Sequence, residues 1–187
     1  PGGRTNHYLF DMNRDWFIQT QPETQGRTKL MLEWDPVAYV DAHEMGSDGT
    51  YFFSPEAVPY NPHLAEDQKA SLQIFGRNNA RWFDEFGIDY FTREVYDSFY
   101  PGYGASWPSY FGSVAMTYEQ ASTRGLVFRQ YDGNELHYRE TVRNHFVTSL
   151  ATAETVANNR EKFLNDFYNY RVSAIEEGQE EDVRSYI

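Results

Sequence analysis

The order of apolar and polar residues along the chain predicts strands that alternate with other elements. Residues 36–45 (PVAYVDAHEM) begin with an apolar, β-branched run and end in charge, which predicts a buried strand with polar residues at its carboxyl end. Residues 114–122 (VAMTYEQAS) predict a second strand of the same kind. A hairpin is expected over residues 126–140, where Asp132 and Gly133 form a dipeptide typical of tight turns.

Three segments have the apolar spacing or the boundary signals of helices. Residues 22–36 predict a short helix that their final proline closes. Residues 61–86 start with an Asn-Pro pair suited to a helix start and are followed by Gly87, which suits its end. Residues 142–172 predict one long helix, with an apolar stripe of Phe146, Leu150, Ala153, Ala157, Leu164 and Phe167. Because strands alternate with helices, the fold class is α/β.

The length of the chain limits its organisation. A chain of 187 residues is long enough for one domain with a hydrophobic core and too short for two full ones. No internal repeat and no linker divides it. Residues 98–113 concentrate Gly, Pro, Ser and aromatic residues in one irregular stretch, so we expect a loop at a surface cleft. No apolar run approaches ~18 residues, so no membrane span is expected.

Charge and cysteine content exclude some classes of function. The formal net charge is −12, which argues against a general nucleic-acid binder, because such a protein needs Lys and Arg to displace counterions. The chain has no cysteine, which excludes disulfides and thiolate zinc sites. Any metal site must therefore use histidine and carboxylate ligands.

His43 is the first candidate for chemistry. It follows the predicted strand in "VDAHE", beside Asp41 and Glu44, and can be either a structural histidine or a metal ligand. A catalytic zinc site usually has three protein ligands and a water. The other histidines show no paired spacing with a carboxylate that would supply the remaining ligands, so the metal site is expected to be incomplete within this chain.

Two further groups allow both a structural and a functional interpretation. Glu119 follows an apolar strand, where it can form a surface ion pair or act as a general base in a cleft whose burial raises a carboxyl pKa. Arg4 and Arg14, with Asn13, can be ordinary surface residues or a clamp for a carboxylate. A guanidinium binds a carboxylate through two parallel hydrogen bonds.

The order of these residues along the chain is more specific than any one of them. Arg4-x-Asn6 and then the run from Asp11 to Arg14 (DMNR) resembles the "GRxN…DLNR" signature of zinc metallocarboxypeptidases. The nine-residue step from Arg4 to Asn13 and the "QPET" that follows resemble the regulatory-type branch of that family. A strand ending in histidine ("VDAHE") and a later strand ending in "T-x-E" ("MTYE") come in the same order. The resemblance covers about residues 1–122.

The resemblance implies a set of catalytic roles. His43 would bind Zn²⁺, Arg4 would polarise the scissile carbonyl, and Glu119 would activate the zinc-bound water and then protonate the leaving amine. The family's other two zinc ligands, in an "HxxE" turn, should lie upstream of Arg4. The resemblance therefore implies a mixed-sheet α/β/α metallocarboxypeptidase-like domain of which only the C-terminal portion is present, with a long C-terminal helix.

The resemblance also implies how a substrate would bind. Asn13 and Arg14 would hold the terminal carboxylate of a peptide or peptide-like substrate, with Asp15-Trp16-Phe17 shaping the pocket. The mobile tyrosine that caps the substrate would be Tyr100, which aligns best, with Tyr103 as the second choice. The candidates for the residue that sets the side-chain preference are Ser106, Ser109 and Ala115.

Two functional hypotheses follow from these residues, with a blander third in which an acidic α/β domain matches the motifs by chance. In the first, residues 1–125 are the C-terminal portion of a zinc carboxypeptidase, and residues 126–187 are a hairpin and long helix that complete or extend the same domain. The 187-residue chain alone would then be inactive. In the second, the chain is a non-catalytic module that binds a peptide carboxylate and has a degenerate metal site. The family resemblance favours a secreted or periplasmic location.

Overall fold

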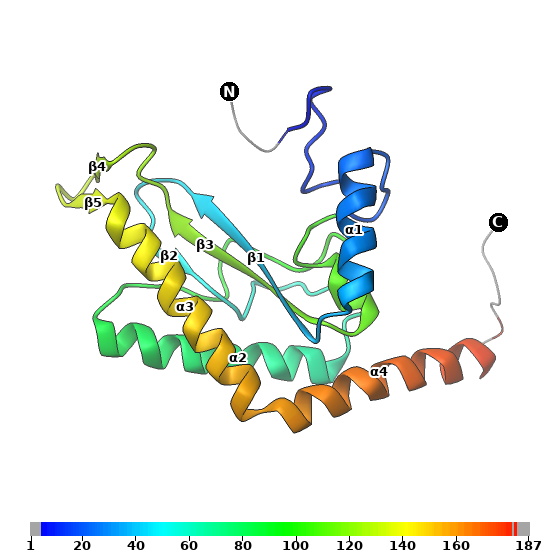
Figure 1. Ribbon diagram of the computed structural model, residues 1–187. Helices are drawn as coiled ribbons and strands as arrows, with labels where there is room; N and C mark the ends of the chain where they lie inside the picture. Colours follow the sequence, from blue (N-terminus) through cyan, green and yellow to red (C-terminus); the bar gives the residue numbers. More distant parts are fainter. Residues whose placement is uncertain (1–4, 181, 183–187) are drawn as a thin grey trace.

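The computed structural model describes residues 5–180 and 182, and its centre is a mixed sheet with helices on both faces (Figure 1). The sheet has the order β1-β3-β2. Strands β1 and β3 are parallel, and β2 pairs antiparallel with β3. The predicted α/β class with a mixed sheet is therefore confirmed. The elements in chain order are α1 (Pro22–Trp34), β1 (Ala38–Met45), β2 (Tyr51–Phe52), α2 (Glu66–Phe86), η1 (Trp107–Phe111), β3 (Val114–Ala121), β4 (Val127–Arg129), β5 (Glu135–His137), α3 (Tyr138–Asn158) and α4 (Arg160–Glu180).

Each face of the sheet carries its own apolar cluster, because successive side chains of a strand point to opposite faces. On one face, residues of β3 pack against α2, α3 and the start of α4, in a cluster that includes Val114, Met116, Tyr118, Phe75, Phe83, Val147 and Phe163. On the other face, a smaller cluster of Trp16, Met31 and Trp107 packs against Tyr39 of β1. This second face, on the side of α1 and η1, is the one on which the candidate site lies.

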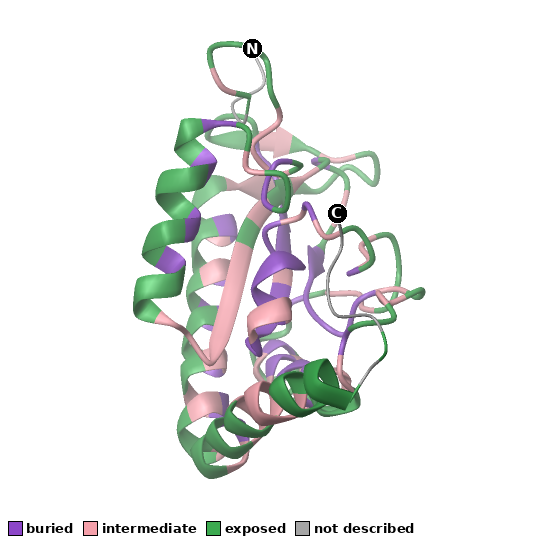
Figure 2. Ribbon diagram, turned by 90° about the vertical axis from the view of Figure 1, so that its right-hand side faces the viewer, coloured by how far each residue is buried: buried purple, intermediate pink, exposed green. Residues whose placement is uncertain are grey.

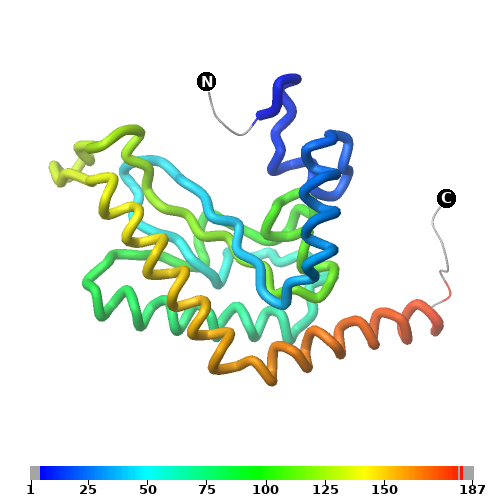
Figure 3. The backbone as a smooth tube through the Cα atoms, viewed as in Figure 1, coloured from blue at the N-terminus to red at the C-terminus, as the bar shows by residue number. Residues whose placement is uncertain are grey.

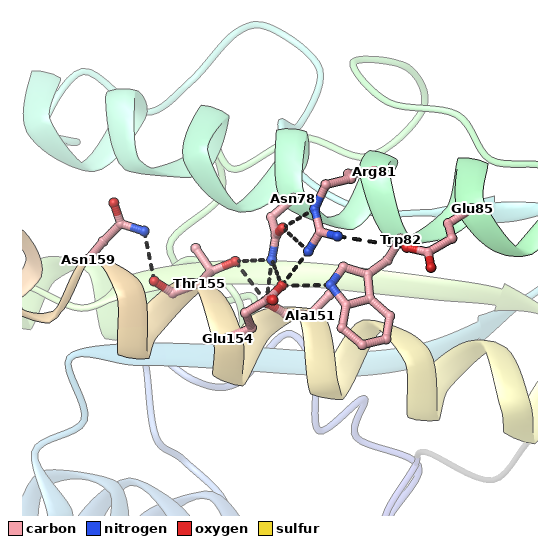
Figure 4. A network of polar contacts seen from close by, with 8 residues as sticks. All are labelled: Asn78, Arg81, Trp82, Glu85, Ala151, Glu154, Thr155 and Asn159. Atoms are coloured by element: carbon pink, nitrogen blue, oxygen red, sulfur yellow. Dashed lines mark hydrogen bonds and ion pairs between the residues drawn. The ribbon is translucent and has the colours of Figure 1, made fainter.

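Helices α2 and α3 are joined by a polar network centred on Glu154 (Figure 4). The Oε2 atom of Glu154 accepts hydrogen bonds from Trp82 Nε1 at 2.7 Å and Asn78 Nδ2 at 3.0 Å, and it pairs with Arg81. The hydrogen bonds from Trp82 and Asn78, together with the charge of Arg81, lower the pKa of Glu154. The carboxylate form of Glu154 therefore favours the folded chain.

We expect Glu154→Gln to lower the melting temperature at neutral pH. A carboxyl whose pKa is lowered on folding stabilises the fold above its unfolded-state pKa of 4.5, and the effect is lost as the pH falls through the lower folded-state value. Thermal unfolding at neutral and acid pH measures this, with Glu161→Gln in the exposed first turn of α4 as the control. A difference between wild type and Glu154→Gln that stays constant down to acid pH would contradict the assignment.

Several boundaries differ from the sequence-based predictions. Helix α2 begins at Glu66, because Asn61 instead starts a turn in which its Oδ1 accepts the backbone N–H of His63 at 3.0 Å. The long C-terminal helical region is present, but it is divided at Asn159 into α3 and α4 (Figure 3). The helix before β1, the hairpin and its Gly133 turn, with φ +90°, lie where they were predicted.

The apolar stripe predicted for residues 142–172 is not the buried face. Phe146, Leu150 and Leu164 are exposed, whereas Val147, Ala151 and Phe163 are buried. The reason is that α3 packs on α2 and β3 through a face rich in small and β-branched residues, which hydropathy alone ranks below the aromatic stripe.

Strand β1 is half-buried, contrary to the prediction of a buried strand (Figure 2). It lies at the margin of the sheet, and among the described residues β3 is its only strand partner. Strand β3, which has a partner on each side, is buried along nearly its whole length. Sequence alone does not reveal which of two apolar strands lies at an edge. No described helix is long and apolar enough to cross a membrane.

Candidate functional site

The site begins at the carboxyl ends of the parallel strands β1 and β3. Their register places Asp41 beside Thr117 and His43 beside Glu119. Residues two apart in a strand share a face, so these four side chains project from the sheet on the side of α1. Carboxyl ends of parallel strands are where α/β proteins place their ligands.

A pocket of about 290 Å³ opens above these strand ends. Its lining residues are Asn13, Arg14, Asp41, His43, Val95, Tyr96, Asp97, Tyr103, Thr117 and Glu119. Five residues singled out from the sequence thus come together: Asn13, Arg14, His43, Tyr103 and Glu119. Tyr100 does not line the pocket, and Arg4 lies outside the described residues.

The segment after Arg14 anchors the pocket to α1. Asp15 is buried, and its carboxylate accepts hydrogen bonds from the Thr20 backbone N–H, the Thr20 hydroxyl and the Gln21 backbone N–H at 2.7–3.0 Å. Burial acts to raise the pKa of Asp15, but these hydrogen bonds outweigh it and lower the pKa overall. Trp16 is buried next to Trp107, with ring centroids 5.9 Å apart. The two residues fix the backbone of the loop, whereas Phe17 is exposed and contributes no such support.

The Arg14 side chain is exposed at the rim of the pocket and held by two contacts. Its Nη1 donates to the backbone carbonyl of Asn13 at 2.8 Å, and its guanidinium lies over the ring of Tyr103, 4.6 Å from the centroid. A guanidinium has five N–H donors in a fixed plane. These two contacts orient that plane and leave several donors for an anionic ligand.

Asn13, Asp41 and His43 form a hydrogen-bonded cluster in the wall of the pocket. The Asp41 Oδ2 atom lies 2.8 Å from His43 Nε2 and 3.1 Å from Asn13 Nδ2. The other end of the Asn13 amide, Oδ1, accepts the backbone N–H of Gly104 at 2.6 Å. Asn13 therefore connects the loop that carries Gly104 to the end of β1.

The loop of residues 98–106 can approach the site closely because of its glycines. A Cβ atom at position 104 would lie 2.5 Å from Asp41 Oδ2, and one at position 102 would lie 2.5 Å from the carbonyl oxygen of Arg14. In this loop, the Tyr100 hydroxyl donates to that same carbonyl oxygen at 3.2 Å. Tyr103 faces the pocket, and Tyr100 supports the loop from outside it.

Glu119 lies deep in the site, with only 8% of its surface exposed. Its neighbour Tyr96, which the sequence reading did not single out, also lines the pocket. Burial, together with the charge of Glu119, raises the pKa of Tyr96 to about 12. The Tyr96 hydroxyl therefore keeps its proton at neutral pH and is available as a hydrogen-bond donor.

A second buried carboxyl lies behind the pocket wall. Glu56 is 1% exposed, and its Oε1 accepts the Ser54 hydroxyl at 2.6 Å and the backbone N–H of Thr117 at 3.3 Å. Burial raises the pKa of Glu56 to about 7. Its carboxyl group extends the hydrogen bonding of β3 beyond the short strand β2.

The described residues do not complete a metal site. Across residues 5–180 and 182, no three His, Asp or Glu side chains come together as ligands. His43 supplies one imidazole, which is one of the three protein ligands that a catalytic zinc usually needs. The described residues thus fit a single zinc ligand and not a whole site.

Sequence reasoning named Asp41 only as a neighbour of His43, and it missed Thr117, Asp97 and Tyr96. Two of these had a usable signal, because Asp41 and Thr117 precede His43 and Glu119 by two positions and so share their strand faces. Tyr96 and Asp97 lie in an irregular segment, where the sequence has no regular spacing of apolar residues that would predict which side chains face the pocket. The suggested specificity residues Ser106, Ser109 and Ala115 are buried and do not line the pocket.

Comparisons with known proteins give one consistent result. No family model and no curated protein matches the sequence significantly. Among solved structures, the chain resembles a metallo-carboxypeptidase from Burkholderia cenocepacia, with a TM-score of 0.63 and 15% identity over 83% of this chain and 40% of that one. It also resembles a metallo-carboxypeptidase from Pseudomonas aeruginosa in complex with (2-guanidinoethylmercapto)succinic acid, with a TM-score of 0.63 and 16% identity over 86% of this chain and 42% of that one. The chain therefore has part of a metallo-carboxypeptidase fold and spans about 40% of the length of these chains.

Proposed function

We propose that the chain is part of a zinc carboxypeptidase that removes the C-terminal residue from a peptide or peptide-like substrate. The observation that carries the proposal is the pocket itself. The pocket brings together an arginine, an asparagine, a histidine and a buried glutamate, on a fold shared with metallo-carboxypeptidases. The exposed guanidinium of Arg14 suits the carboxylate at the end of a substrate, and the buried carboxyl group of Glu119 suits a general base.

Substrate binding starts at Arg14. Its guanidinium, oriented by Tyr103, binds the terminal carboxylate through paired charge-assisted hydrogen bonds. Asn13 holds the Gly104 loop and Asp41 in place beside it. Tyr103 is better placed than Tyr100 to cover a bound substrate, because only Tyr103 lines the pocket. Tyr96 is a third candidate for that role.

Glu119 acts on protons. It takes a proton from the water that attacks the scissile carbonyl and later delivers it to the leaving amine. Its burial keeps competing solvent away from the carboxylate. Arg4 is proposed to stabilise the oxyanion, and His43 to hold zinc together with ligands from outside the described residues. When bound, zinc supplies Lewis acidity and an acidified water.

The architecture agrees with a partial site. Strand β1 has an outer edge without a strand partner among the described residues. Helices α1 and α3, which cover opposite faces of the sheet, each carry exposed apolar side chains, such as Leu30 and Phe146. In a parallel sheet both faces are normally covered, and each inner strand pairs with a neighbouring strand on either side. A further part of the fold beside β1 would cover this margin and supply the missing zinc ligands.

One observation favours a second function. The described residues contain no group of three His, Asp or Glu side chains placed to bind a metal. A module that binds a peptide carboxylate through Arg14 without cleaving the peptide needs no metal. In that case Glu119 has a structural role only.

Mass spectrometry of peptide products distinguishes the two functions. The longer protein, loaded with zinc, is expected to release a single residue from a peptide with a free C-terminus and to act far more slowly on the C-terminal amide of that peptide. The 187-residue chain is expected to release nothing, because one imidazole does not hold zinc at catalytic occupancy. Binding of the peptide by the zinc-loaded longer protein without any release would favour the binding module and reject the enzyme.

A further inference from the structure

We propose that the exposed apolar side of α3 binds a second copy of this chain, with the two α3 helices packed antiparallel. The α3 stripe consists of five exposed apolar residues: Val142, Phe146, Leu150, Ala153 and Ala157. Val142, Phe146 and Leu150 have 50%, 61% and 42% of their surface exposed. A row of large apolar side chains in water is typical of a surface that binds a partner.

The α3 stripe is distinct from the open edge of β1. The side of α3 that faces the sheet is buried, since Asn144 Nδ2 donates to Gln120 Oε1 at 2.9 Å and the Thr148 hydroxyl lies 2.7 Å from that of Tyr51. Phe146 is two residues from both Asn144 and Thr148, which places it about 160° around the helix from each of them. A segment added beside β1 would extend the sheet, whereas the stripe points away from the sheet.

The stripe is complementary to itself in spacing and in size. Its members follow one another by four, four, three and four residues, the steps that keep one side of a helix against a neighbouring helix. An antiparallel pair with its twofold axis between positions 148 and 149 packs Phe146 against Leu150 of the second copy. The same register packs Val142 against Ala153 of the second copy, so that a larger side chain meets a smaller one in both layers.

The charges beside the stripe favour the same antiparallel register. Arg143 is exposed, and Glu154 follows it by eleven residues, close to three full turns, so both lie on one flank of the stripe. The contacts described for Glu154 within the chain use Oε2, which leaves Oε1 for a partner. The antiparallel register brings Arg143 of each copy to Glu154 of the other. A parallel pair would instead place Arg143 beside Arg143 and Glu154 beside Glu154, and like charges repel across an interface.

Sedimentation velocity of the 187-residue chain tests the proposal. The wild type is expected to be a dimer at micromolar concentration. Phe146→Ser should raise the Kd of the dimer by at least roughly a hundredfold, because a symmetric interface loses the side chain twice. Arg143→Glu should also raise it, because it places two carboxylates together. Tyr131→Ser, which removes an exposed aromatic residue of the β4–β5 hairpin, is the control and should leave the Kd unchanged. Thermal unfolding shows that each variant is folded.

Cysteine crosslinking tests the register, because the chain has no cysteine of its own. Position 149 lies next to the twofold axis, so a short bis-maleimide is expected to join two copies of the Ser149→Cys variant. Two copies of position 157 lie about 25 Å apart in an antiparallel pair, so Ala157→Cys alone should not be joined. A mixture of Ala157→Cys and Val142→Cys should be joined, because these positions meet across the interface.

Three results would overturn the proposal: a wild type that stays monomeric at high micromolar concentration, a dimer that Phe146→Ser leaves intact, or crosslinking of Ala157→Cys as efficient as that of Ser149→Cys. The longer protein provides the last comparison. A dimer of it that Phe146→Ser weakens supports the proposal. A monomer would show that a further part of that protein covers the stripe, and would overturn it. None of these positions lines the pocket, so failure here leaves the proposed function standing.

Discussion

Glu119→Gln is expected to remove most turnover from the zinc-loaded longer protein and to leave its zinc content unchanged. A general base contributes roughly 10²–10⁴-fold to a rate, so kcat should fall by a factor in that range. The amide keeps the shape of the side chain but does not accept the proton. Glu119 lies deep in the pocket, where solvent water does not easily replace its function.

Steady-state kinetics and metal analysis on the same samples test this prediction. Glu44→Gln is the matched control, because it removes a carboxylate next to His43 on the exposed, opposite face of β1, and we expect it to change kcat little. Retention of more than about a tenth of the wild-type kcat by Glu119→Gln would lie outside the range expected for a general base and would reject that role.

The strand ends of the site were predictable from the sequence. His43 and Glu119 each follow an apolar run, and the parallel register of β1 and β3 places them side by side. The pattern of apolar residues was enough because both strands are long and regular. It did not reveal that β1 lies at the margin of the sheet, since strand order depends on contacts distant in sequence.

The ends of the helices were only partly predictable from local sequence signals. Gly87 ends α2 in the left-handed conformation, with φ +62°, as its sequence position suggested. Asn61 was expected to start that helix, but it caps a separate turn, because an asparagine side chain accepts a backbone N–H equally well in either setting. The division at Asn159 was not predicted, because no proline or glycine marks it.

The wall of the pocket was the least predictable part. Tyr96 and Asp97 enter it through an irregular segment, and only tertiary packing determines that Tyr103 lines the pocket while Tyr100 supports the loop from outside. Asp41 had a signal in its position two residues before His43. Its significance depends on Asn13, which lies 28 residues earlier in the chain.

Arg14→Ala is expected to weaken the action on peptides with a free C-terminus far more than on their C-terminal amides. A charge-assisted hydrogen bond contributes about 1.5–3 kcal/mol, so a lost carboxylate contact reduces kcat/KM roughly ten- to over a hundredfold. An amide does not accept the same pair of charged hydrogen bonds and has little to lose. Arg14→Lys should recover only part of the loss, because an ammonium lacks the planar fork that Tyr103 orients.

Arg27→Ala provides the control for this prediction. Arg27 belongs to the same region, donates to the Met12 carbonyl at 2.8 Å and lies over the Trp16 ring, but it does not line the pocket. Its loss should disturb the loop that carries Arg14 without removing a ligand contact. We therefore expect Arg27→Ala to affect acid and amide substrates equally.

The most direct test of a carboxylate-reading site is the ratio of kcat/KM for a matched peptide acid and peptide amide, measured on the zinc-loaded longer protein and its Arg14→Ala variant. A selective site predicts a high acid-to-amide ratio in the wild type that falls by roughly ten- to over a hundredfold in Arg14→Ala. Equal losses of kcat/KM for the acid and the amide would mean that Arg14 supports only the fold. The pocket would then not bind C-terminal carboxylates selectively.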